Sequence, residues 1–294
     1  MTSNGPVFGL GTAATNYTIP PAELGSWLES NGFESLWFGE HSHVPTGQKS
    51  LRPNYRETPA AYREIYDPFV SLMGVAAATS TLKIGTSILI LTEHHPIRLA
   101  KAVATLDQMS RGRVILGIGA GWSAEEMADY GVEFSSRWKL VRETVLAIRE
   151  IWNNDVAEFE GEMVKFEPMW CGPKPVQKNG PPVLMGAWNS YAIGRIVEYC
   201  DGWVPVDQGD VMQGLMDGLR AACDKGGRSF DELDHTVVID PLTEYVTADN
   251  DLERRVEQLH KMGFKRILFT FLQDSAENQW RKLERLHQVV RTFA

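Results

Sequence analysis

Titratable side chains follow two strand-like segments of the chain. The stretch SLWFGEHSH (residues 35–43) ends in Glu40, His41 and His43, and GTSILILTEHHPIR (85–98) runs from apolar residues into a glutamate and two histidines. An imidazole beside a carboxylate can move protons near neutral pH, so these residues suggest general acid–base catalysis. We therefore take His41, with Glu40, as the candidate catalytic pair. A surface or capping role is the alternative for each histidine.

A glycine-rich stretch, GIGAGWS (117–123), raises the question of a nucleotide site. Its Gly-x-Gly-x-Gly spacing departs from the dinucleotide pattern Gly-x-Gly-x-x-Gly, and it lies on the fourth expected strand rather than the first. A Rossmann site is therefore not expected. Glycines at a strand end instead let a flat ring lie against the backbone. Ser123 and Glu126 have the spacing of a capping box, which predicts a helix start directly afterwards.

The segment GAWNSYAIGR (186–195) reads as a strand that turns into a helix. Backbone N–H groups at Asn189, Ser190 and Tyr191 would point outward at the positive end of this helix and could hold a phosphate. Simple capping by Asn189 or Ser190 explains the same residues equally well.

A basic loop contrasts with the acidic composition of the chain. Residues 47–63 carry four cations and one acid, which are Lys49, Arg52, Arg56, Arg63 and Glu57. The loop could form a pocket for an anionic cofactor tail or substrate. A solvated surface loop is the alternative.

The His-x-His spacing of His41 and His43 also fits a metal-dependent hydrolase. Such a site needs further ligands, and the fifth and sixth strand ends, LMGAW and WVPVDQ, offer no histidine or lysine. Asp274 lies beyond the last strand. A metal hydrolase is therefore a distant alternative, and we expect no bound metal. A barrel that binds without catalysing would leave the gathered titratable groups unexplained.

Strand-like and helix-like segments alternate along the whole chain. The expected strands are 7–14, 35–40, 82–91, 113–121, 181–188, 201–206, 236–246 and 266–272. Eight β–α units predict a single (β/α)8 TIM barrel domain over residues 1–294, with insertions at 41–66 and 155–182. Long insertions in a barrel are usually functional. Parallel strands end at one face of a barrel, so the groups described above should converge there.

The composition limits the possible partners. The net charge of −9 gives no sequence-wide basic surface for nucleic acid. No apolar run approaches the roughly 20 residues needed to span a bilayer, and no secretory signal is visible. Three cysteines without Cys-x-x-Cys spacing predict neither a disulfide framework nor a zinc ribbon. We expect a cytoplasmic enzyme that acts on a small molecule, without nucleic acid or membrane partners.

With these residues in view, the chain resembles the luciferase-like flavin and deazaflavin oxidoreductases. The similarity is clearest in GTSILILTEHHPIRLAKAVATLDQMSRGRVILGIGAGW (85–122) and extends through GFESLWFGEH (32–41) and the stretch 181–206. LGIGAGWSAEEM (116–127), with Glu40–His41, is most similar to the branch that uses coenzyme F420, a 5-deazaflavin that transfers hydride. The resemblance implies hydride transfer to or from a small organic substrate, with an FMN-dependent monooxygenase that uses reduced flavin and O2 as the alternative.

The resemblance also implies roles for individual residues. His41 matches the active-site histidine, and Ser87–Ile88 matches a cis peptide behind the ring, so we predict a cis bond there. The implied ring and ribityl contacts are Gly119, Ala120, Gly121 and Trp122, and the implied phosphate loop is Gly186, Ala187, Trp188, Asn189 and Ser190. Trp37, Trp122 and His43, with the 41–66 loop, are expected to shape the substrate pocket. Where some deazaflavin dehydrogenases of the family carry a catalytic glutamate, this chain has Trp122.

A homodimer is the expected assembly. The predicted helices at 67–80 and 96–110 carry FVSLMGVAAA and IRLAKAVATL, which is more apolar surface than one side of a barrel buries. The family resemblance implies the same.

Overall fold

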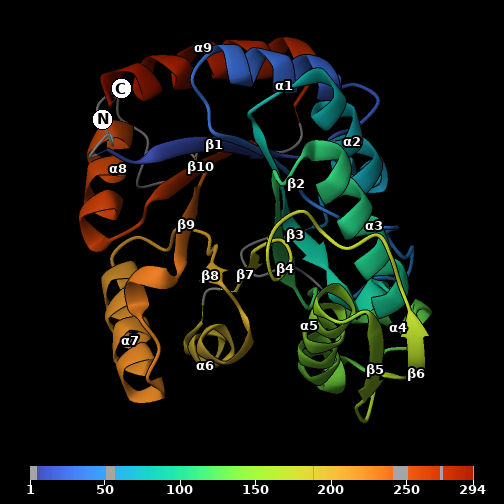
Figure 1. Cartoon of the computed structure of the whole chain (residues 1–294). Helices are drawn as coiled ribbons and strands as arrows, with labels where there is room; N and C mark the ends of the chain where they lie inside the picture. The colour runs from blue at the N-terminus through green and yellow to red at the C-terminus, as the bar shows by residue number, and fades with distance from the viewer. Residues whose placement is uncertain (1–4, 51–56, 188, 241–250, 272–273, 294) are drawn as a thin grey trace.

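The computed structural model describes residues 5–50, 57–187, 189–240, 251–271 and 274–293. Within these ranges, eight parallel strands close into a barrel in which β10 pairs with β1. In order around the barrel they are β1 (Val7–Thr12), β2 (Ser35–Phe38), β3 (Lys83–Ile90), β4 (Val114–Gly119), β7 (Val183–Met185), β8 (Gly202–Trp203), β9 (Asp234–Ile239) and β10 (Arg266–Phe271). The predicted (β/α)8 fold is confirmed (Figure 1).

The helices surround the strands, as Figure 1 shows. They are α1 (Pro21–Ser30), α2 (Pro68–Ala78), α3 (Pro96–Ser110), α4 (Ala124–Asp129), α5 (Arg137–Asn153), α6 (Ser190–Tyr199), α7 (Val211–Gly226), α8 (Asp251–Met262) and α9 (Ala276–Thr292), with short 3-10 turns η1 (Ala60–Arg63), η2 (Leu91–Glu93), η3 (Phe134–Ser136) and η4 (Phe230–Glu232). Proline is the first residue of α1, α2 and α3, where its missing N–H costs no helical hydrogen bond. None of the helices in the described ranges combines the length and apolar character that a bilayer crossing requires.

A small apolar cluster fills the interior of the barrel. Its buried members are Trp37, Ile115, Leu184, Val204, Val238 and Leu268. Trp37 has no exposed surface, because the strands around it enclose its indole. The prediction that Trp37 lines the substrate pocket is therefore wrong: this side chain packs the core.

Both predicted insertions are present, and one has regular structure that the sequence did not indicate. Residues 155–182 contain an antiparallel hairpin of β5 (Val156–Glu160) and β6 (Lys165–Trp170). Its turn is held by Glu143 of α5, whose carboxylate accepts hydrogen bonds from the N–H groups of Met163 and Val164 at 2.8 and 2.9 Å. The insertion is therefore fixed to the helix that precedes it.

Candidate functional site

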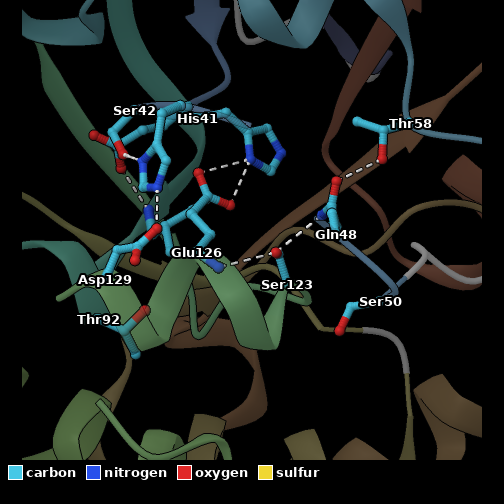
Figure 2. A network of polar contacts seen from close by, with 12 residues as sticks. His41, Ser42, Gln48, Ser50, Thr58, Thr92, Ser123, Glu126 and Asp129 are labelled. Carbon is cyan, nitrogen blue, oxygen red and sulfur yellow. Dashed lines mark hydrogen bonds and ion pairs between the residues drawn. The ribbon is translucent and has the colours of Figure 1, made fainter. Parts of the chain in front are cut away.

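His41 lies just beyond the carboxyl end of β2, with its side chain 9% exposed. Its Nδ1 is 3.2 and 3.0 Å from the two carboxylate oxygens of Glu126, and Figure 2 shows the two groups facing each other. The imidazole stacks on Tyr62 with 4.4 Å between ring centroids, and Trp122 meets its edge at 5.5 Å. A carboxylate at Nδ1 favours the tautomer with the proton on Nδ1. Nε2, which has no partner among the described residues, is then left for proton transfer.

Glu126 stands in the first turn of α4. The predicted cap is present, because the Ser123 hydroxyl accepts a hydrogen bond from the Glu126 N–H at 3.2 Å. The Glu126 side chain, however, turns to His41 and is only 3% exposed. Its spacing from Ser123 is fully explained by capping, so no separate signal in the sequence pointed to this contact.

The insertion after β2 forms one wall of the site. The Gln48 amide donates a hydrogen bond to the Ser123 hydroxyl at 2.9 Å and accepts one from Thr58 at 2.9 Å, as Figure 2 shows. These bonds tie the loop to α4, and η1 places Tyr62 against His41. The sequence did not single out Tyr62.

The basic residues of this loop can be located only in part. The backbone N–H of Lys49 donates to Glu125 at 2.9 Å. Arg63 ends η1 and is exposed. Arg52 and Arg56 lie outside the described residues.

Glu40 directly precedes His41 in the sequence and is buried, but its side chain does not contact His41. One carboxylate oxygen accepts the N–H of Ile90 at 2.7 Å, and the other lies 2.8 Å from Nε2 of His94. These contacts brace β2 against the end of β3. The structure thus corrects the predicted Glu40–His41 pair: Glu126, not Glu40, is the carboxylate that contacts His41. His95 is the exposed residue that leads into α3, as expected.

Glu93, at the end of η2, brings a third carboxyl group to this region. Burial raises the pKa of Glu93 to about 9, with further contributions from the nearby charges of Glu126 and Glu40.

His43 faces the rim of the site. Its Nε2 lies 2.9 Å from Asp129 and its Nδ1 lies 2.8 Å from the Ser42 hydroxyl, with the side chain 38% exposed. His41 and His43 thus contact different carboxylates. Within the described ranges, no three His, Cys, Asp or Glu side chains are arranged to hold a metal ion.

The peptide bond between Ser87 and Ile88 is cis, as predicted. The space beside two neighbouring glycines is filled by Ile88. A Cβ on Gly119 would come within 2.5 Å of Ile88 Cδ1, and one on Gly186 within 2.2 Å of Ile88 Cγ2. The missing side chains make room for Ile88. This half-buried residue supplies an apolar surface between the ends of β4 and β7.

The residues after Gly119 differ in their access to a ligand. Ala120 is 2% exposed and belongs to the core, and its carbonyl accepts a hydrogen bond from Thr92 at 3.2 Å. Its side chain therefore cannot contact a bound ring in this structure. Gly121, Trp122 and Ala187 are half-buried and remain accessible.

The start of α6 is exposed, and the capping alternative for it is confirmed. The Asn189 side chain accepts a hydrogen bond from the N–H of Ala192 at 3.2 Å. Asn189 and Ser190 are both exposed. Trp188, the remaining predicted residue of the phosphate loop, lies outside the described residues.

Two arginines lie near Trp138, and one of them, Arg195, belongs to α6. The guanidinium carbons of Arg195 and Arg137 lie 4.2 and 5.9 Å from the ring centroid of Trp138. Burial and the nearby charge of Arg195 lower the pKa of Arg137. Arg195 also donates to the Tyr191 carbonyl at 2.9 Å, in the first turn of α6. Two neighbouring cations suit an anionic group. The sequence did not indicate this cluster.

Comparison with known proteins identifies the family. The model of the luciferase-like monooxygenase family matches residues 20–288. The chain belongs to this family. That membership argues against the metal-dependent hydrolase, since the family is one of oxidoreductases.

Known proteins that are similar to this luciferase-like chain in sequence or in fold differ in the cofactor that their names give. An uncharacterised protein of Mycobacterium tuberculosis is 32% identical and covers 95% of this chain and 96% of its own. An F420-dependent glucose-6-phosphate dehydrogenase of Nakamurella multipartita is 28% identical over 86% of this chain and 71% of its own. The oxygenating constituent of a Pseudomonas putida diketocamphane monooxygenase, solved with FMN, shares the fold with a TM-score of 0.73 at 16% identity, over 97% of this chain and 98% of that one.

Proposed function

We propose that this luciferase-like protein is an F420-dependent oxidoreductase that transfers a hydride between the deazaflavin and a small organic substrate. The observation that carries the proposal is the buried His41–Glu126 contact at the barrel mouth. Hydride transfer from an alcohol needs a base for the hydroxyl proton, and the reverse reaction needs an acid. Nε2 of His41 can serve as either, because Nδ1 is occupied by a carboxylate.

The residues at the mouth fit a flat ring with an anionic tail. Ile88 offers an apolar surface for one face of a ring, and the exposed start of α6 with Arg137 and Arg195 suits a phosphate. The deazaflavin, when bound, would supply the hydride acceptor or donor. The residues of this chain would then bind the substrate beside Tyr62 and Trp122 and hold or move its proton at His41.

The N. multipartita relative supports F420 as the cofactor. The amino-acid sequence of residues 116–127, which resembles the F420-dependent branch, favours the same cofactor. An FMN-dependent monooxygenase is the second candidate, which the family name and the P. putida structure support. FMN also has a flat ring and a phosphate, so the binding residues suit both.

Binding titrations of the purified apoprotein with F420 and with FMN, followed by absorbance, test the proposal. We expect micromolar affinity for F420, which weakens with salt and with Arg195→Ala because the tail is anionic. Arg281→Ala on the exposed face of α9 is the matched control and should leave affinity unchanged. Micromolar binding of FMN with no binding of F420 would overturn the proposal in favour of the monooxygenase.

A further inference from the structure

Three carboxyl groups lie close together, one of them in contact with His41, and they differ in their partners. Glu126 contacts His41, and Glu40 contacts His94 and the Ile90 N–H. Both oxygens of Glu93 are buried, and neither has a hydrogen bond of ordinary geometry within the described ranges. The Glu93 carboxyl group instead faces Glu126, Glu40 and the hydroxyl of Ser42.

We propose that Glu93 is a neutral carboxylic acid that completes a His41–Glu126–Glu93 relay, in which the proton on Glu93 lets Glu126 stay a carboxylate and hold His41 with Nε2 outward. The inference deepens the proposed function and depends on the acid–base role of His41. Glu93 and Glu126 would both be positioning residues, because they act through His41.

The proton belongs on Glu93 because of what the other carboxylates contact. Adjacent buried carboxyl groups cannot all ionise, so one of them retains a proton. Glu126 has an imidazole N–H to accept, and Glu40 has a backbone N–H and the His94 ring. Glu93 has no such donor except the hydroxyl of Ser42. The assignment of the proton to Glu93 agrees with the pKa of this residue, which burial and its two carboxylate neighbours raise to about 9.

The charged groups around Glu93 come from two of the elements packed near it. The segment after β2 presents Glu40, His41 and Ser42, and α4 presents Glu126. Helix α5 also packs against η2. Its buried carboxylate, Glu143, is turned away to the hairpin turn at 162–164, where it accepts backbone N–H groups.

The relay predicts a specific response to high pH. Below about pH 9 Glu93 is protonated and Glu126 has a neutral neighbour. As the pH rises through this value, Glu93 becomes a third negative charge and repels Glu126, which loosens its hold on His41. Turnover should therefore have an alkaline limb near pH 9 that depends on residue 93.

The substitution Glu93→Gln, which cannot ionise, tests this limb. We expect the variant to keep turnover at neutral pH within about tenfold and its alkaline limb to move up by a pH unit or more. Glu93→Asp should keep a limb, and Glu133→Gln, at an exposed position after α4, should match the wild type. A uniform loss of turnover with the limb unmoved would mean that Glu93 is merely structural.

Infrared spectroscopy of the apoprotein tests the proton itself, independently of cofactor and turnover. A protonated carboxyl band should be present at neutral pH, disappear as the pH rises through about 9, and be absent in Glu93→Gln. The Glu133→Gln control should retain it. If the band is missing in the wild type or survives in Glu93→Gln, the relay is wrong. If F420 fails to bind but the band behaves as expected, only the proposed cofactor fails.

Discussion

His41 owes its proposed chemistry to side chains that the chain brings from elsewhere. A histidine alone titrates near neutral pH, but without a fixed tautomer and orientation it is a poor catalyst. Here Glu126 holds one ring nitrogen, while Tyr62 and Trp122 restrict the ring. The other nitrogen can then present the same lone pair or proton in each turnover.

Replacing His41 by alanine should lower kcat by about a hundredfold or more, which is typical for the loss of a general acid or base. Cofactor affinity should change little, because the proposed ring and phosphate contacts come from other strand ends. His43→Ala is the control. That histidine is exposed and contacts Asp129, so we expect less than a tenfold effect. Steady-state kinetics with a cofactor titration separate these outcomes, and near-wild-type kcat in His41→Ala would remove it from the mechanism.

The sequence identified His41 and Ile88 but not the residues that act on them. His41 follows an apolar strand, so its place at the barrel mouth could be predicted from chain order. Its contact with Glu126 joins positions 85 residues apart, whereas the sequence favoured Glu40, the residue directly before it. The direction in which each side chain points at the end of its strand determines which acid contacts His41. That direction cannot be read from the order of residues in the sequence.

At the scale of elements, Arg113 joins two helices to the strand that follows them. Its guanidinium donates to the carbonyls of Ala76 and Leu82 at 2.8 and 2.7 Å, and its Nε donates to Ser110 at 2.7 Å. Ala76 and Ser110 lie at the ends of α2 and α3, where carbonyls lack helical partners. A cation at this position also complements both helix dipoles.

Arg113→Ala should therefore destabilise the fold by about 3 kcal/mol, since several charge-assisted hydrogen bonds are lost and buried carbonyls are left without donors. Arg113→Lys should recover only part of this, because an ammonium cannot reach the same carbonyls as a planar guanidinium. Urea unfolding measures the difference. Arg98→Ala, at an exposed position of α3, is the control. Equal stability of Arg113→Ala and Arg98→Ala would contradict the proposed bracing.

Most elements could be located from the sequence, and the exceptions have separate physical causes. The strands that read as continuous apolar runs, such as 83–90 and 114–119, match closely because both their faces are buried. The hairpin at 156–170 was missed because most of its residues are exposed, so burial imposes no clear pattern. The strand at 201–206 is shorter than predicted, since only Gly202–Trp203 make regular ladder pairs.

At the scale of the whole molecule, the two ends of the barrel differ in how their charged side chains are arranged. At the amino-terminal end, Arg266 contacts Glu34 and Asp234 at 2.9 and 2.7 Å. Burial alone would raise the pKa of Glu34, but Arg266 and Lys83 overcome it and lower the pKa to about 2. At the carboxyl end, three carboxyl groups crowd together and one stays protonated. The paired charges suit stability, whereas the crowded end suits proton transfer, as expected for a (β/α)8 barrel.

The outer surface of α2 supports the expected homodimer, which we propose on that basis. The helix PFVSLMGVAAA carries no charge, and Val70 and Ala77 are exposed on it. Helix α3, also expected to contribute, presents Arg98 and Lys101 to solvent, so α2 is the better candidate. A second copy could cover this face without burying a charge, whereas a charged partner would lose hydration.

Sedimentation should give a mass near twice the 32.9 kDa of one chain at micromolar concentration. Val70→Glu, which places a charge in the proposed interface, should shift the protein to monomer, because an unpaired carboxylate would have to be buried to keep the contact. Val211→Glu on α7 is the matched control, since Val211 is also exposed and lies on another side of the barrel. A wild-type mass of one chain would refute the dimer. A dimer that persists in Val70→Glu but dissociates in Val211→Glu would instead move the interface from α2 to α7.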